Sequence, residues 1–508
     1  MAERMWQRFP FQAAPFLFAI FFFLFSYEIN NFNLTIDDER HAFFTQEFVA
    51  LGRWLFPIVQ LVWPQLVVPQ ATYLIFGILI SITYCLALGL LGDRELKPFH
   101  FICFAAFVAF PAVPAQLEYA AHIIPIGLSF LCTMLAVVLT LDAPAHAGSQ
   151  RWLRLLAAVL LCTVAAGAYQ SAILIYPVVL APVVAYRTFL RDDRRYADAI
   201  KLYLTGLAIV VVATTLYSAI AWLFLAVSGI TPASDYLNKA YMASGTSALD
   251  HLIARLVEFP RGMYLVLYGL WWDFGIARYS FVLAIAFSAW LIVRAAGTWL
   301  AAIATAAILA AILLIPGALI LVSGTEMPLR TFVAAPAALM IIFLLAYRVS
   351  SSQFVRNTLT ALLVLFVIQC MYINSTQQAQ AWVTQRHDLV LAGALNHDIM
   401  SLVEVREGET VTLDFHGFQE SHNVFPRAPT VLLGESFVEW TRNHHGRLVF
   451  YLNLTGFYWY KATSDEEHVR LKPLYADMPV WPRPGSIRIV DGVTLVKLGS
   501  CDPATGKC

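Results

Sequence analysis

The sequence predicts a polytopic α-helical membrane protein of about eleven transmembrane helices, followed by a C-terminal α+β domain. Three observations lead to this class. Hydrophobic residues make up 59% of the 508 residues and charged residues only 13%, against about 25% charged in soluble domains. Apolar runs long enough to cross a bilayer, roughly 17–25 residues, recur as far as the middle of the 370s. Beyond that point the runs stop, and charged and turn residues return.

The apolar runs locate the helices. The expected spans are residues 13–30, 70–91, 99–114, 121–141, 152–168, 171–187, 202–228, 278–294, 298–322, 331–348 and 357–374. The first follows a short head with Arg4 and Arg8 and lacks the small-residue cleavage pattern of a signal peptide, so we expect it to remain as the first helix. We assign Trp271-Trp272-Asp273 to the membrane interface, where Trp is enriched.

Basic residues set the expected orientation. With the N-terminus in the cytoplasm, the inner segments contain about twice as many Lys and Arg as the outer loops. The cluster from Arg187 to Lys201 is the strongest marker of the inner side. An odd number of helices then places the C-terminal part outside, which gives a membrane domain over residues 1–376 and an external α+β domain over residues 377–508.

The C-terminal domain shows strand patterns. Val411–Phe415, Arg447–Leu454 and Ser486–Leu498 are rich in β-branched and aromatic residues and are predicted as strands. Asp491-Gly492 divides the last of these runs and indicates a hairpin turn, because Gly tolerates positive φ. Ala379–Leu395 is predicted as a helix that leads out of the membrane.

Cysteine and histidine usage agrees with an external domain. Cys501 and Cys508 stand close together in the polar tail, where a disulfide suits an oxidising compartment; a metal pair there lacks nearby ligands. The irregular spacing of the histidines in this domain favours surface positions over a metal site. These histidines are His416, His422, His444 and His445.

Motif absences narrow the chemistry. The sequence contains no Gly-rich phosphate loop and no nucleotide-binding fingerprint, and we expect no nucleic-acid partner. If the external face carries an enzyme that transfers a sugar, nucleotide sugars are not available to it there. The sugar donor of such an enzyme would have to arrive attached to a lipid.

Polar residues gather in the outer loops. The first loop contains three consecutive acids, Asp37-Asp38-Glu39, and then Arg53-Trp54. The later outer loops add further candidates, which are Glu118, Tyr169, Gln170, Asp235, Lys239, Asp273, Glu326 and Arg330. Because every loop on this side supplies polar groups while the spans hold almost no charge, the outer face is the candidate site.

Four short motifs resemble one family. They are Ile36-Asp37-Asp38-Glu39, Gly52-Arg53-Trp54, Ala168-Tyr169-Gln170-Ser171, and Met478-Pro479-Val480-Trp481-Pro482 with Gly485-Ser486-Ile487. Together with the layout of the chain they resemble the serotype-converting O-antigen glucosyltransferases of Gtr type II, which are similar to the broader GT-C class. Pro114–Tyr119 keeps only part of a longer Asn-Pro…Glu…Tyr pattern, so the identity of the sugar stays open.

The resemblance implies a reaction and partners. It implies transfer of a sugar, with glucose favoured, from polyprenyl phosphate to a lipid-linked O-antigen or related surface glycan at the periplasmic face of a bacterial inner membrane. An upstream donor synthase and a flippase would supply the donor.

The resemblance also implies residue roles. It places the general base among the first-loop acids, which we rank Asp38, then Asp37, then Glu39, since an acceptor hydroxyl needs a base. The leaving phosphate needs cations, for which Arg53 and Arg330 are candidates. The remaining substrate-binding candidates are Trp54, Glu118, Tyr169 and Gln170. Adjacent acids also suit Mg²⁺ or Mn²⁺, so a divalent cation is left open.

Simpler interpretations exist for these residues. The three acids also suit the first turn of a helix, Arg53 an interfacial anchor, Arg330 a salt bridge to a lipid headgroup, and Tyr169-Gln170 a hydrogen bond between helices.

Two other function classes also fit a membrane protein of this kind. They are an O-antigen polymerase or ligase and a transporter of lipid-linked glycans. A transporter would place ionisable residues within its spans, and a polymerase or ligase would need neither the acid triplet nor a β-rich terminal domain.

Overall fold

The computed structural model divides the chain into two compact units. The first comprises residues 1–32, 45–374 and 429–431, and the second residues 33–44, 375–428 and 432–508. The structure describes residues 9–31, 34–42, 46–65, 67–191, 196–232, 248–267, 279–321, 328–403, 409–421, 423–425, 433–441, 444–457 and 459–499. The second unit thus includes the acid segment of the first loop, which the sequence-based division had placed with the membrane helices.

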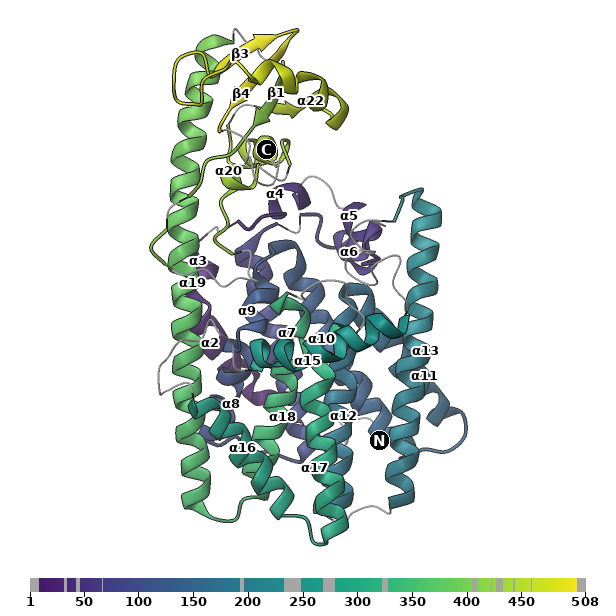
Figure 1. Cartoon of the computed structure of the whole chain (residues 1–508). Helices are drawn as coiled ribbons and strands as arrows, with labels where there is room; N and C mark the ends of the chain where they lie inside the picture. The colour runs from purple at the N-terminus through teal and green to yellow at the C-terminus, as the bar shows by residue number, and fades with distance from the viewer. Residues whose placement is uncertain are drawn as a thin grey trace. The chain divides into compact units, whose positions relative to one another are not determined.

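The first unit is entirely helical in its described part (Figure 1). Its α-helices are α2 (Ala14–Leu24), α3 (Ser26–Asn30), α5 (Gln46–Ala50), α6 (Leu55–Gln60), α7 (Pro69–Leu91), α8 (Pro98–Ala109), α9 (Ala112–Leu117), α10 (Ile123–Asp142), α11 (Ser149–Ala168), α12 (Ile175–Ala185), α13 (Tyr196–Ser228), α15 (Ala248–Leu267), α16 (Tyr279–Arg294), α17 (Trp299–Leu314), α18 (Ala334–Val349) and the first part of α19 (Gln353–Leu402). Short 3-10 or π segments join them, and these are η1 (Phe11–Ala13), η2 (Ala120–His122), η3 (Ala143–Ala145), η4 (Gln170–Leu174), η5 (Tyr186–Leu190), η7 (Ile315–Leu321) and η8 (Leu329–Phe332).

Length and composition of these helices support a membrane protein. Within the described residues, 8 helical segments are long and apolar enough to cross a bilayer, and each coincides with a predicted span. The other three predicted spans correspond to shorter apolar helices, at Phe11–Leu24, Pro98–Ala109 and Tyr279–Arg294. A total of eleven crossings therefore stays a prediction.

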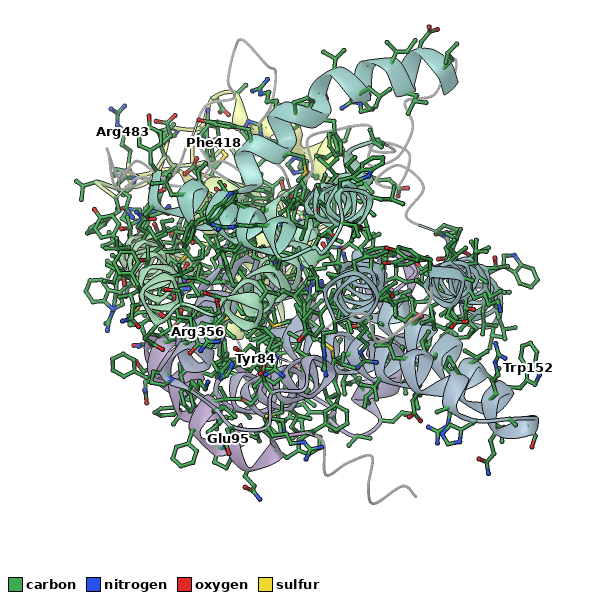
Figure 2. All side chains as sticks on the ribbon, turned by 90° about the horizontal axis from the view of Figure 1, so that it is seen from below. Tyr84, Glu95, Trp152, Arg356, Phe418 and Arg483 are labelled. Atoms are coloured by element: carbon green, nitrogen blue, oxygen red, sulfur yellow. The ribbon has the colours of Figure 1, made fainter. Side chains whose placement is uncertain are left out.

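The bundle has a buried centre and an apolar outer surface. Helix α18 is buried along almost its whole length, against α8, α12, α16 and α17. Helix α13 instead exposes large apolar side chains, including Leu207 and Trp222. Figure 2 shows the same contrast, with Trp152 at the edge of the molecule and the buried Tyr84 inside it. Such an exterior is costly in water and favourable in hydrocarbon.

The second unit contains a small mixed sheet. Its strands are β1 (Val411–His416), β2 (Tyr460–Ala462), β3 (Ile487–Val490) and β4 (Val493–Lys497), in the order β2-β1-β4-β3. Strand β1 pairs in parallel with β2 and β4, and β3 pairs antiparallel with β4. The hairpin predicted at Asp491-Gly492 is present, with positive φ at both turn residues.

Helices accompany this sheet. They are α4 (Asp38–His41), the second part of α19, α20 (Phe437–Trp440), α21 (Arg447–Leu454), α22 (Asp465–Leu471) and η9 (Lys472–Tyr475). Helix α19 is continuous for 50 residues, so the predicted helix at Ala379–Leu395 is a part of it.

One predicted strand is wrong. Arg447–Leu454 forms helix α21, and its buried residues are Leu448, Val449, Tyr451 and Leu452. This spacing of one, two and one residues places the four side chains on one helical face. Composition alone favoured a strand. A run of eight residues is too short to distinguish the helical period of 3.6 residues from the strand period of two clearly.

Some predicted features lie outside the described residues. These are the Cys501–Cys508 disulfide, the interfacial Trp271-Trp272-Asp273, the surface histidine His422, and the loop candidates Asp235, Lys239 and Glu326. The cysteines in the apolar helices are described, and all five are free thiols.

The core of the sheet predicts one stability effect. Leu495 on β4 is fully buried against Leu471, Tyr475, Met478 and Val493, so Leu495→Ala should destabilise the second unit by about 2–5 kcal/mol. Thermal unfolding and protease resistance of the full chain in detergent measure this effect. Ile489→Ala on β3, which is half exposed, is the control, and equal losses in both variants would contradict the assignment of this core.

Candidate active site

The three first-loop acids differ in environment. Asp38 and Glu39 are fully buried, whereas the side chain of Asp37 is 31% exposed. Asp37 also has φ of +94°, a left-handed conformation that, among the described non-glycine residues, only Asp491 shares. Such strain costs about 1–3 kcal/mol and is often found at functional sites. Asp37 is therefore the acid best placed to meet a ligand.

Hydrogen bonds hold this turn. The Asp37 N–H donates to Glu39 Oε2 at 2.7 Å, and the Asp37 carbonyl accepts the N–H groups of Arg40 and His41. Asp38 Oδ2 accepts the Thr35 N–H at 3.1 Å, so this carboxylate closes the turn. The helical-turn interpretation thus fits Asp38 well, although the sequence-based ranking had placed it first as the base.

Arg447 joins the other two acids. Its Nη2 lies 2.6 Å from Asp37 Oδ1, and its Nη1 lies 2.9 Å from Glu39 Oε1. The Arg447 side chain is only 11% exposed. The arrangement is a buried ionic triad in which one guanidinium serves two carboxylates.

Burial sets the protonation of Glu39. Desolvation raises the pKa of Glu39 to about 7, although the Arg447 charge lowers this pKa; the Asp37 charge raises it further. Nearby, burial and the Arg40 charge, together with His445 and Arg447, lower the pKa of His444 to about 4. His444 is thus neutral beside this triad at neutral pH.

The first unit contains a second polar cluster, built around Arg53. Arg53 Nη1 donates to His122 Nε2 at 3.2 Å, and its guanidinium lies over the Tyr169 ring, 4.8 Å from the centroid. The His122 ring stacks on Tyr119, with centroids 4.9 Å apart, and Arg330 lies over that Tyr119 ring at 5.1 Å. Two predicted phosphate-binding arginines are thereby connected through aromatic rings.

Backbone contacts fix this arginine cluster. Gln170 Nε2 donates to the Leu51 carbonyl at 2.7 Å and contacts Tyr217 Oη at 3.0 Å. Gly52, which lies between Leu51 and Arg53 in the chain, has φ of +77°. It lies against Tyr217 Oη, which leaves no room for a side chain. On the other side, Gln116 Nε2 donates to the Arg330 carbonyl. Gln170 therefore positions the Gly52-Arg53 turn.

Several buried donors near Arg53 have no protein partner within the part of the chain that the structure describes. They are Arg53 Nε, the indole N–H of Trp54 and the hydroxyl of Ser171, which follows Gln170. Trp54 itself is 5% exposed and packs against Gly167. Buried donors left unpaired are costly, and an anionic ligand would satisfy them.

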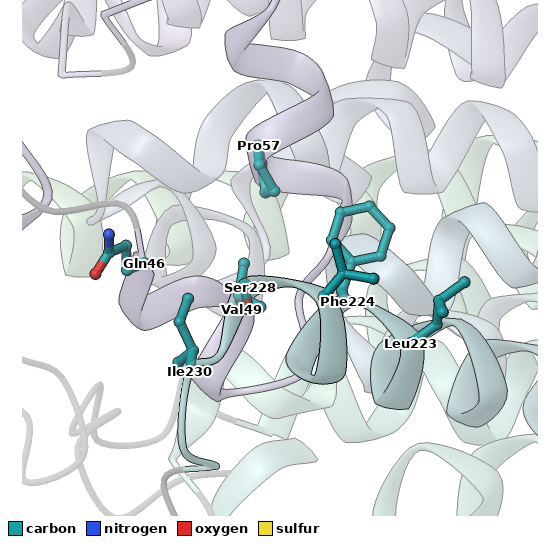
Figure 3. Close-up of a pocket in the computed structure, with 8 residues that line it drawn as sticks. Gln46, Val49, Pro57, Leu223, Phe224, Ser228 and Ile230 are labelled. Carbon is teal, nitrogen blue, oxygen red and sulfur yellow. The ribbon is translucent and has the colours of Figure 1, made fainter.

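An apolar groove lies beside this cluster. Its volume is about 470 Å³, and Figure 3 shows it between α5, α6 and the end of α13. The lining residues are Gln46, Val49, Pro57, Leu223, Phe224, Val227, Ser228 and Ile230. The ring of Phe224 also neighbours Trp54, at 6.1 Å between centroids. The groove could accept an acyl or isoprenoid chain whose head lies near Trp54.

The chain belongs to a glucosyltransferase family. The model of the family described as glucosyl transferase GtrII matches residues 26–368, which is more than half of the chain. No curated protein and no solved structure matches it. The protein is thus a GtrII-family glucosyltransferase, an enzyme that moves a glucosyl group from a donor to an acceptor.

The remaining candidate in the matched region of this transferase is Glu118. It is 7% exposed and directly follows α9, in a buried stretch that includes Gln116 and Tyr119. Glu118 is therefore not simply exposed in a short loop between helices. A buried carboxylate next to Tyr119 fits a substrate-binding role as well as a structural one.

The histidines of the second unit differ from their predicted surface positions. His416 and His445 are buried, because they pack against Tyr475 and His468 around Asp414. Asp414 accepts hydrogen bonds from His468, Thr463 and Tyr475. Burial alone would raise the pKa of Asp414, but these hydrogen bonds outweigh burial and lower it.

A metal ion fits this histidine cluster poorly. Asp414, His445 and His468 bring ligand-type atoms within 4.8 Å of one another. However, the rings of His445 and His468 stack with centroids 4.2 Å apart and planes 7° apart. A metal binds imidazole nitrogen in the plane of the ring, so two stacked rings do not converge on one ion. The hydrogen-bonded core explains the cluster.

Sequence reasoning missed several residues of the transferase. It assigned no role to His122, Tyr119 and Ser171, although they adjoin predicted residues and their polar or aromatic type at helix ends was an available signal. Arg447 had no such signal, since it lies 408 residues from Glu39 in a segment predicted as a strand.

Arg53 provides the test of the arginine cluster. Arg53→Ala should lower the kcat/KM for glucosyl transfer about 100-fold, because the developing charge of an anionic leaving group loses its donor. Arg294→Ala is the matched control, since Arg294 also covers an aromatic ring, that of Trp290, at 5.1 Å. Transfer assays in membranes, at equal protein levels, compare the two. Unchanged transfer by Arg53→Ala would rule out this role.

Proposed function

We propose that this glucosyltransferase moves glucose from polyprenyl phosphate to a lipid-linked O-antigen or related surface glycan at the periplasmic face of a bacterial inner membrane. The observation that carries the proposal is the triad in the first loop, in which the strained and partly exposed Asp37 shares Arg447 with the buried Glu39. A carboxylate held in this way is suited to act as a general base.

The arginine cluster and the groove support the lipid-linked donor. A polyprenyl phosphate sugar has an apolar chain and one phosphate, and the first unit offers an apolar groove and an arginine with unpaired donors nearby among its described residues. Arg53 would bind the phosphate, with Trp54, Tyr169, Gln170 and Arg330 around it. The donor would be produced by a cytoplasmic-side synthase and brought across by a flippase.

The transfer step follows from these assignments. Asp37 accepts the proton of the acceptor hydroxyl while the hydroxyl oxygen forms a bond to the anomeric carbon. The bond from that carbon to the phosphate oxygen breaks, and polyprenyl phosphate leaves with the electron pair. Arg53 and Arg330 stabilise the charge on the leaving phosphate. A displacement in one step inverts the configuration at the anomeric carbon.

A divalent cation at the acid turn fits less well than Arg447. The guanidinium already contacts Asp37 Oδ1 and Glu39 Oε1, so a metal bound through these two oxygens would have to displace it. Arg447 instead supplies positive charge at the carboxylates.

Substitution of the acids tests the base. Asp37→Asn should reduce kcat for transfer by about 100-fold or more, because the amide cannot accept the proton. The assay uses membranes that lack the donor synthase, to which polyprenyl-phosphate glucose is added as the donor. Nucleotide glucose added in its place should not support transfer. Glu466→Gln, an exposed acid on α22, is the control. Loss of transfer in Asp38→Asn, with transfer retained in Asp37→Asn, would assign the base to Asp38 instead.

Orientation has an independent test. Alkaline phosphatase fused after residue 508 should be active in intact cells, because this reporter is active only in the periplasm. Green fluorescent protein at the same point should be dark, because it fluoresces only when it folds in the cytoplasm. A fluorescent fusion with inactive phosphatase would place the second unit in the cytoplasm and exclude a periplasmic reaction.

A further inference from the structure

We propose that Arg447 is a positioning residue for glucosyl transfer, and that the C-terminal part of the second unit (residues 375–428 and 432–508) thereby belongs to the catalytic machinery. Arg447 acts by holding the carboxylates of Asp37 and Glu39 in one fixed arrangement. The inference rests on the proposed role of Asp37 as the base. Arg447 lies beyond residues 26–368, the part of the chain that the family match covers.

The geometry of the contacts is the first argument. The two terminal nitrogens of Arg447 contact one oxygen from each acid, at 2.6 Å and 2.9 Å. A planar guanidinium offers these donors in a rigid fork, so it determines the spacing of the two carboxylates. Glu39 in turn accepts the Asp37 N–H at 2.7 Å, which supports the left-handed backbone of Asp37. Arg447 thus stabilises both the side chain and the conformation of Asp37.

Charge is the second argument. The charge of Asp37 disfavours ionisation of Glu39, which is fully buried. The Arg447 charge is the opposing influence on Glu39, and a further cation near this triad is Arg40, beside the neutral His444. Loss of the guanidinium would leave a buried carboxylate unpaired, which is far more costly than loss of a surface pair.

The position of Arg447 is itself well fixed. Arg447 begins α21, whose buried residues pack into the second unit. Asn453 near the end of α21 exchanges two hydrogen bonds with the backbone of Tyr460 on β2, at 2.8 Å and 2.6 Å. On the opposite side, Gln385 of α19 donates to the Leu34 carbonyl at 2.7 Å. Arg447 and Gln385 therefore both hold the acid segment within the second unit.

This arrangement predicts that the arginines of the second unit differ in their effect on glucosyl transfer. Loss of an exposed arginine should leave transfer unchanged, whereas loss of Arg447, which positions the base, should reduce it. Arg470 on α22 provides the comparison, because its side chain is 58% exposed and pairs only loosely, at 3.5 Å with Glu467 and 3.7 Å with Asp491.

The experiment compares four variants of the full chain in membranes. Arg447→Gln should lower kcat about 100-fold through misplacement of the base, with a much smaller change in the KM for polyprenyl-phosphate glucose. Arg447→Lys should lose about tenfold, because one ammonium replaces a rigid fork. Arg470→Gln should match the wild type. The double variant Arg447→Gln/Glu39→Gln should recover part of the kcat lost in Arg447→Gln, because a neutral amide in place of the Glu39 carboxylate no longer repels Asp37.

The pH profile separates positioning from simple support of the fold. The Arg447 charge lowers the pKa of Glu39, so its removal should shift the ionisation of Glu39, and with it the rising limb of kcat against pH, to higher pH in Arg447→Gln. Thermal unfolding of each variant in detergent identifies any that are merely unstable. Wild-type kcat and an unmoved pH limb in a folded Arg447→Gln, with Asp37→Asn inactive, would overturn the positioning role alone. Full activity in Asp37→Asn would instead overturn the proposed base.

Discussion

The ion triad of Arg447, Asp37 and Glu39 is the interaction on which the candidate chemistry depends. A buried charge requires a partner, and here one guanidinium compensates two carboxylates that the chain places two residues apart. Because the partner comes from the other end of the sequence, the first loop cannot form its acidic turn in isolation. The strained backbone of Asp37 is explained in the same way, since surrounding contacts over-determine it.

The lipid environment explains where charged residues lie in the chain. Apolar helices satisfy their backbone groups internally and need no charge, so ionisable groups collect at helix ends and in loops. There, the guanidinium groups of Arg53 and Arg330 lie over the aromatic rings of Tyr169 and Tyr119. The acids are gathered separately, in the second unit, beside Arg447.

Much of this organisation was predictable. Eight apolar runs coincide with long apolar helices, since a helix in lipid needs little more than length and hydrophobicity. The β-hairpin at Asp491-Gly492 followed from local turn chemistry. By contrast, Arg447–Leu454 was mistaken for a strand, because a short apolar run fits both periods and only packing selects one. The buried histidines around Asp414 were missed for a similar reason, since burial depends on neighbours distant in sequence.

The sequence by itself determined the membrane class, the position of the acids and arginines between the apolar runs, and the resemblance to the glucosyltransferase family that the family match confirmed. These properties depend on composition and local motifs. Only the tertiary structure decided which acid is strained and partly exposed, which one closes a turn, and that Arg447 pairs with two of them. Side-chain burial and a contact across 408 residues are consequences of packing, and no local pattern encodes them. The acidic triplet is thus three residues with three different environments.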